Sequence, residues 1–148
     1  MRGMEARDIA LAQARGRMAV GAAYVLAPGL FGRIWVGREA TRPGAKILAR
    51  AFGARDLALG LGVVIAIDRG APVRGWLEGS ALSDAVDFLA GVLDRDALPP
   101  ATRAGVLALG AGSSALAAWL ARTLDSEGEG LEGMTPEAAV TGHPDQPG

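Results

Sequence analysis

The sequence predicts an all-α protein, a four-helix integral membrane bundle followed by a disordered acidic C-terminal tail. Half of the 148 residues are apolar, and proline and charge divide them into four blocks of helical length. The last of these blocks has 18 residues and no charge. The stretch 123–148 holds six acidic residues, no Lys or Arg, and eight Gly and Pro. We therefore expect one transmembrane domain, 1–122, and a tail, 123–148, that cannot bury enough apolar surface to fold.

The first predicted helix covers 18–32, a run without a charge. It extends to 37 if Arg33 reaches the headgroups and Trp35 lies in the aromatic belt of the interface. The charges before it spread over 17 residues, and no suitable cleavage site follows. This pattern is not typical of a secretory signal, so we expect residues 9–17 to form a short amphipathic lead-in to a retained span.

The second and third predicted helices, 47–67 and 76–93, carry charges inside their apolar runs. These are Arg50, Arg55, Asp56, Glu78, Asp84 and Asp87. A charge at the centre of a bilayer costs about 2.5–3.5 kcal/mol on insertion scales. We therefore expect these two helices to insert together with their neighbours rather than alone.

The fourth predicted helix, 104–121, meets the length of about 17–20 residues that a bilayer core requires. The alternative is a soluble four-helix bundle, whose helices should show a charged face opposite an apolar stripe. The fourth block has apolar residues all round, with Ser113 and Ser114 as its polar positions. This pattern favours the membrane bundle.

Small residues recur at four-residue spacing and predict close contacts between helices where little hydrophobic driving force exists. In the second helix they are Ala54, Ala58, Gly62 and Ala66, and in the fourth Ala104, Ala108 and Gly112.

A polar stripe runs along the third helix, because Asp84 and Asp87 lie three residues apart and Ser80 precedes Asp84 by four. It must face protein, an aqueous cavity or a partner rather than lipid. We expect Arg55, with Arg50 as a second candidate, to pair with these carboxylates. Arg55 and Asp56 point about 100° apart on a helix and are not expected to serve the same partner directly. The predicted intramembrane network is Arg50, Arg55, Asp56, Ser80, Asp84 and Asp87.

Other classes of site are disfavoured, and we predict no catalytic, cofactor-binding or metal-binding residues and no enzymatic activity. The chain has no Cys, and its one histidine, His143, lies in the tail and cannot build a zinc site alone. Residues 110–115 fit a dinucleotide-binding pattern but lack the second strand and acidic residue that it needs. The body carries +5 and the tail −6, yet the arginines are scattered without aromatic neighbours, so nucleic acid is not an expected partner.

The expected partners are the lipid bilayer and either a second copy of the chain or an unknown membrane protein. We expect a multi-pass protein of the cell membrane. Four spans place seven basic residues on the side of the termini and six on the other, and a cytoplasmic location of both termini is the default.

Two segments resemble a known family. Residues 50–62 (RAFGARDLALGLG) and 83–88 (SDAVDF) are similar to the DUF4267 family of small four-helix actinobacterial membrane proteins. The resemblance covers the two middle helices and implies an integral membrane protein of no assigned activity. It also draws attention to Arg50, Gly53, Arg55, Asp56, Gly60, Asp84 and Asp87.

The sequence leaves two functions open. The first is a non-enzymatic membrane component that acts through helix packing and assembly, with the charges fixing which helices meet. The alternative is a small transporter-like or proton-relay subunit that uses the Arg/Asp network.

Overall fold

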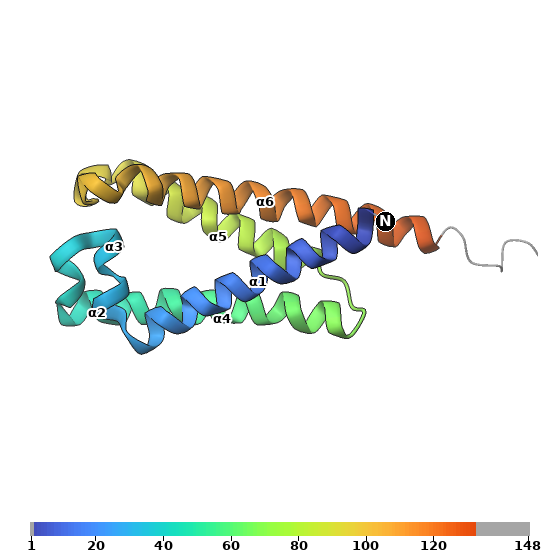
Figure 1. The fold of residues 1–148 in the computed structure, drawn as a ribbon, viewed down its shortest axis with the longest axis horizontal. Coiled ribbons are helices and arrows are strands. Elements are labelled where there is room, and N and C mark those ends of the chain that lie inside the picture. Colours follow the sequence, from blue (N-terminus) through green and yellow to red (C-terminus); the bar gives the residue numbers. More distant parts are fainter. Residues whose placement is uncertain (1, 133–148) are drawn as a thin grey trace, which may run out of the picture.

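The computed structural model describes residues 2–132, and within that range the chain is helical and contains no strand. The all-α prediction is confirmed. Four long helices form the body, and two short helices and two 3-10 turns form the joints (Figure 1). The elements are α1 (Arg2–Leu26), α2 (Pro28–Phe31), α3 (Arg33–Val36), η1 (Gly37–Thr41), α4 (Pro43–Asp68), α5 (Arg74–Leu93), η2 (Arg95–Ala97) and α6 (Pro100–Glu132).

The long helices pack as two pairs, α1 on α4 and α5 on α6, and α1 also crosses α6 (Figure 1). The backbones of α1 and α4 meet at Gly21 and Gly53. A Cβ atom at Gly53 would lie 2.5 Å from the carbonyl oxygen of Gly21, so a larger residue requires a backbone shift. The predicted small-residue ridges differ from this contact. In α4, Gly62 and Ala66 are buried but Ala54 and Ala58 are exposed, and in α6 the residues Ala104, Ala108 and Gly112 are exposed.

The first predicted span is wrong as a single straight helix. α1 begins at Arg2, so residues 9–17 belong to it, and it ends at Leu26. Ala27 then leaves the helical region (φ −132°, ψ 57°), because a proline ring disfavours helical geometry at the residue before it. The chain bends by 107° between Glu5–Leu26 and Pro28–Thr41.

The last helix extends past the predicted boundary between body and tail. α6 continues through Glu132 and so includes the first part of the segment that was expected to be disordered. The remainder of the predicted tail, 133–148, lies outside the described residues.

By length and hydropathy, one described helix could cross a membrane. It is Arg103–Leu124, which contains the predicted fourth span. Of the apolar stretch of this helix, 22% is buried inside the bundle. A second span is possible if the bent pair in the first third of the chain counts as one broken helix. Neither α4 nor α5 qualifies when the number of charged residues in the span is also limited, so four spans remain a prediction.

Three regions follow one another along the bundle. At the end that holds the N-terminus lies an apolar cluster that includes Ala10, Val63, Leu77 and Leu120. The charged side chains meet in the middle of the four long helices. Beyond them, at the end that holds α2 and α3, lies a cavity. The cluster closes one end of the bundle, and the charges and the cavity form the candidate site.

Candidate functional site

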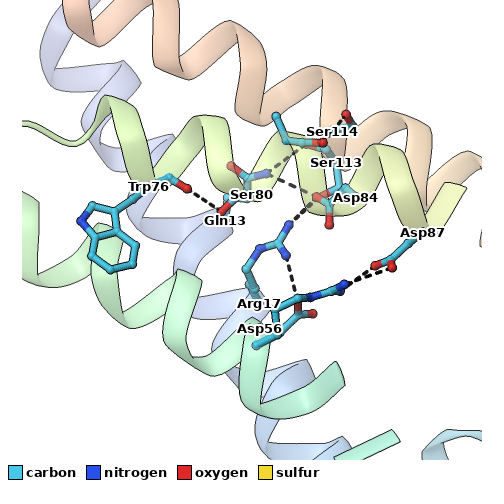
Figure 2. A network of polar contacts seen from close by, with 11 residues as sticks. Gln13, Arg17, Asp56, Trp76, Ser80, Asp84, Asp87, Ser113 and Ser114 are labelled. Atoms are coloured by element: carbon cyan, nitrogen blue, oxygen red, sulfur yellow. Dashed lines mark hydrogen bonds and ion pairs between the residues drawn. The ribbon is translucent and has the colours of Figure 1, made fainter. Parts of the chain in front are cut away.

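Arg17 of α1 is the centre of the charged region and is 9% exposed. Its Nη1 donates to Oδ1 of Asp56 in α4 at 3.0 Å, and its Nη2 donates to Oδ2 of Asp84 in α5 (Figure 2). The same Nη2 reaches Oγ of Ser113 in α6 at 3.5 Å. One guanidinium therefore contacts all three of the other long helices.

Asp84 also accepts a hydrogen bond from a side chain of α6. Oγ of Ser113 donates to Oδ2 of Asp84 at 2.6 Å (Figure 2). Nε2 of Gln13 in α1 donates to the carbonyl oxygen of Ser113 at 3.2 Å, and Oγ of Ser114 donates to the carbonyl oxygen of Ala81 at 2.8 Å. These bonds link α1, α5 and α6 through polar groups that would be costly to bury unpaired.

Arg55 of α4 and Asp87 of α5 form a two-pronged ion pair. Nη1 of Arg55 donates to Oδ1 of Asp87 at 3.1 Å, and Nη2 donates to Oδ2 at 2.6 Å. Nη2 also lies 3.3 Å from Oδ1 of Asp56, and the guanidinium carbon lies 4.5 Å from the centre of the Phe52 ring. Asp56 thus joins this pair to Arg17, and the contacts form one connected network.

The charges of this network do not cancel. It contains two guanidinium groups, Arg17 and Arg55, and three carboxylates, Asp56, Asp84 and Asp87. With all five groups ionised, one negative charge is left over. A proton or another cation can neutralise it.

The structure brings together four of the six predicted network residues: Arg55, Asp56, Asp84 and Asp87. The predicted pair of Arg55 with Asp87 is present. Asp84, however, binds Arg17 of α1 and not Arg55 of α4. Arg55 and Asp56 have different partners in the structure, Asp87 and Arg17, and they also contact each other directly at 3.3 Å.

The other two predicted members have different partners. Arg50 is exposed, and its Nε donates to the carbonyl oxygen of Val25 at 3.3 Å. Ser80 is buried, but its Oγ donates to the carbonyl oxygen of Trp76 in its own helix at 2.9 Å (Figure 2).

Sequence reasoning missed Arg17, Gln13 and Ser113 as members of the network. A signal for Arg17 was available, since Ala10, Ala14, Arg17 and Gly21 follow one another at intervals of three and four residues. This spacing places Arg17 on the small-residue face of a helix, and that face packs against neighbouring helices. The surrounding charges made the segment resemble a solvated lead-in.

The network ends at a cavity of about 470 Å³. Its walls come from α1, α3, η1 and the first half of α4 on one side, and from the last half of α5 and η2 on the other. Three aromatic rings line it, with Phe52 lying 5.1 Å from Tyr24 and 6.0 Å from Trp35 between ring centres. Asp87 lines it as well, so the cavity and the network share a side chain.

Among the described residues, no group of three or more Asp, Glu or His side chains is placed to hold a metal ion. Residues 110–115 lie inside α6, and His143 lies outside the described residues. Comparisons with protein-family models, curated proteins and solved structures found no match. Membership in the DUF4267 family stays a prediction.

Proposed function

We propose that this chain is a multi-pass helical membrane protein, a non-enzymatic component whose Arg–Asp network fixes how its helices pack. One observation carries the proposal: large apolar side chains lie on the outside of the bundle while ionised groups lie inside. Leu82 and Leu109 are each 68% exposed, whereas Asp56 is 5% and Asp84 8% exposed. Water-soluble proteins place these residue types the other way round.

The exposed apolar side chains are not confined to the one helix that qualifies as a span by composition. Each of the four long helices carries at least two. They are Ile9, Val20 and Leu26 in α1; Ile47, Leu48, Leu61 and Ile65 in α4; Trp76, Leu82, Val86, Leu89, Val92 and Leu93 in α5; and Leu109 and Trp119 in α6. An apolar surface of this extent requires lipid or protein against it. This favours a bilayer around the whole bundle over a single anchor.

The carboxylates in the middle of α4 and α5 are compatible with this location because they are paired. An isolated charge at the bilayer centre is costly, but Asp56, Asp84 and Asp87 each contact a guanidinium group. The bent segment fits the membrane surface. Leu30 and Ile34 are 64% and 50% exposed, and Arg33 and Arg38 lie beside them, which is typical of an interfacial segment.

The proposed role of the network is assembly. Because Arg17 must satisfy Asp56, Asp84 and Ser113 together, a different packing of the helices would leave buried charges unpaired. The proposed surroundings are the lipid bilayer and a second copy or an unknown membrane protein. We place both termini in the cytoplasm.

A second candidate is a small transporter-like or proton-relay subunit. The observation that favours it is the surplus negative charge of a network that reaches a cavity through Asp87. Arg55, Asp84 and Asp87 would then carry a proton or respond to a solute.

An alkaline-carbonate wash of cell membranes tests the proposal, because it strips peripheral proteins and leaves integral ones. We expect the full chain to stay in the membrane pellet. Recovery in the carbonate supernatant would contradict a membrane-embedded bundle.

The two candidate roles separate on single substitutions. Packing predicts that Arg55→Ala and Asp87→Ala each lower stability and that exchanging the two residues partly restores it. Single variants that fold as the parent does but abolish proton or solute flux in liposomes would show that packing is not the main role.

A further inference from the structure

We propose that the cavity beside the network binds an amphipathic organic cation, a small molecule with an apolar body and one positive charge. This inference goes beyond the packing role, because it assigns a ligand to a part of the molecule that packing does not need. It rests on the chemistry of two opposite walls and on the size of the space between them.

The first wall is aromatic. Tyr24, Trp35 and Phe52 line the cavity and contact one another edge to face or at a tilt. Aromatic rings attract cations to their faces within about 6 Å of the ring centre. Phe52 already makes one such cation–π contact, since the Arg55 guanidinium lies 4.5 Å from its ring centre.

The second wall is acidic and open. It is formed by Asp87, Ala90 and Gly91 of α5 and by Asp94, the residue that follows this helix. Their spacing places them on one face. Two carboxylates therefore stand one above the other with only small side chains between them. That arrangement leaves room for a ligand next to negative charge.

The charge of the lining selects the sign of the ligand. Among the described residues that line the cavity there are two carboxylates and no Lys, Arg or His. Arg55 balances Asp87, but with all five groups ionised the network to which they belong carries one more negative than positive charge, and Asp94 is a further carboxylate. An anion would meet repulsion from these carboxylates, whereas a cation would be attracted both by them and by the aromatic rings.

The size of the cavity points to an organic molecule. A volume of about 470 Å³ falls within the range of roughly 300–1,000 Å³ that is usual for small-molecule sites. A bare metal ion would use little of this space and none of the aromatic surface. An apolar body carrying a charged centre uses both walls.

The experiment uses the purified full chain in a mild detergent and two probes of nearly the same shape and opposite charge, tetraphenylphosphonium and tetraphenylborate. Isothermal titration calorimetry should show saturable binding of tetraphenylphosphonium at about one per chain. Tetraphenylborate should bind at least tenfold more weakly. Equal or tighter binding of tetraphenylborate, or no saturable binding of the phosphonium, would overturn the proposal.

Two substitutions locate the bound probe, each with a matched control. Trp35→Leu keeps an apolar side chain but removes the ring, and should weaken phosphonium binding by about 5–30-fold. Asp94→Asn removes an exposed charge and should weaken it by about fivefold. Trp119→Leu in α6 and Asp68→Asn at the far end of α4 should leave it unchanged.

If Trp35→Leu and Asp94→Asn bind the phosphonium as their controls do, the probe is not in this cavity and the proposal is wrong. Binding in detergent does not depend on how many helices cross a bilayer. A failure here would therefore leave the membrane proposal standing, and a failure of the carbonate test would leave this one standing.

Discussion

Two Arg–Asp sites in this molecule use the same chemistry in different surroundings. The side chains of Arg17 and Asp84 are 7% and 10% exposed, whereas those of Arg55 and Asp87 are 34% and 20% exposed. Arg17 contacts three other long helices, while Arg55 connects α4 to α5 at the edge of a cavity. The difference indicates a division of roles within one network. We propose that the enclosed site holds the bundle together and that the outer site can contact a ligand.

The largest effect is expected from Arg17→Ala, which leaves Asp56 and Asp84 buried without their main partner. Removing one member of a buried ion pair costs about 3–5 kcal/mol. Unfolding of the detergent-solubilised chain by SDS titration, followed by circular dichroism, measures the loss. Arg15→Ala is the matched control, because Arg15 is an exposed arginine in the same helix. Similar stability of the two variants would show that Arg17 is not central to the packing of the helices.

The next largest loss of stability is expected from Gly21→Ala, at the close contact between α1 and α4. A Cβ at Gly21 would lie 2.6 Å from the carbonyl oxygen of Gly53, so Gly21→Ala forces the helices apart. The expected loss is about 2 kcal/mol. Gly16→Ala, in the same helix and with nothing within 4 Å, should be neutral or slightly stabilising. If both variants gain stability in the same titration, the close approach is absent.

A smaller effect separates two serines that look alike in the sequence. Ser113 donates to the Asp84 carboxylate, and Ser113→Ala should cost about 1.5 kcal/mol because the acceptor is charged. Ser80 donates to a carbonyl oxygen of its own helix, and Ser80→Ala should cost less than about 0.5 kcal/mol. The free energies of unfolding of the two variants provide the comparison, and the reverse order would contradict it.

The outer pair is expected to contribute less to stability than the Ser113–Asp84 hydrogen bond. Arg55→Ala should cost about 1 kcal/mol, because the pair is partly exposed. The exchanged double variant, Arg55→Asp with Asp87→Arg, should recover part of that loss, and its free energy of unfolding is the readout. A loss of stability in Arg55→Ala as large as that in Arg17→Ala would show that the two sites contribute equally to stability.

The sequence predicted the parts of this fold that depend on composition and helical spacing. The helical class, the charge-free run of α6 and the pairing of Arg55 with Asp87 all follow from such local patterns. Asp84 shows where spacing stops being sufficient. The sequence predicts its position on a helix face, but its partner, Arg17, lies 67 positions away in the sequence and is brought to it by the packing of the helices.

The structure departs from the expected helix bounds at the first span and at the C-terminus, for different reasons. Pro28 ends α1 and turns the chain. Mean hydropathy does not register this break, because the residues on both sides of Pro28 are apolar. Between Thr123 and Glu132 the composition favoured disorder, yet the helix continues there as an extension of α6. A rigid preceding helix supplies the costly nucleus, so a short polar extension can stay helical.

The most direct test of the central claim is thiol labelling of single cysteines in intact membranes, since the chain has no cysteine of its own. Ala58→Cys and Leu82→Cys introduce thiols on the outward faces of α4 and α5, the two helices whose spans are proposed, and Ala71→Cys introduces one in the joint between them. Each is treated from both sides with a membrane-impermeant maleimide. We predict that the thiol at 71 reacts from one side and that those at 58 and 82 react only after detergent is added. Reaction at 58 and 82 at the rate seen at 71 would show that water surrounds the bundle and would contradict the account.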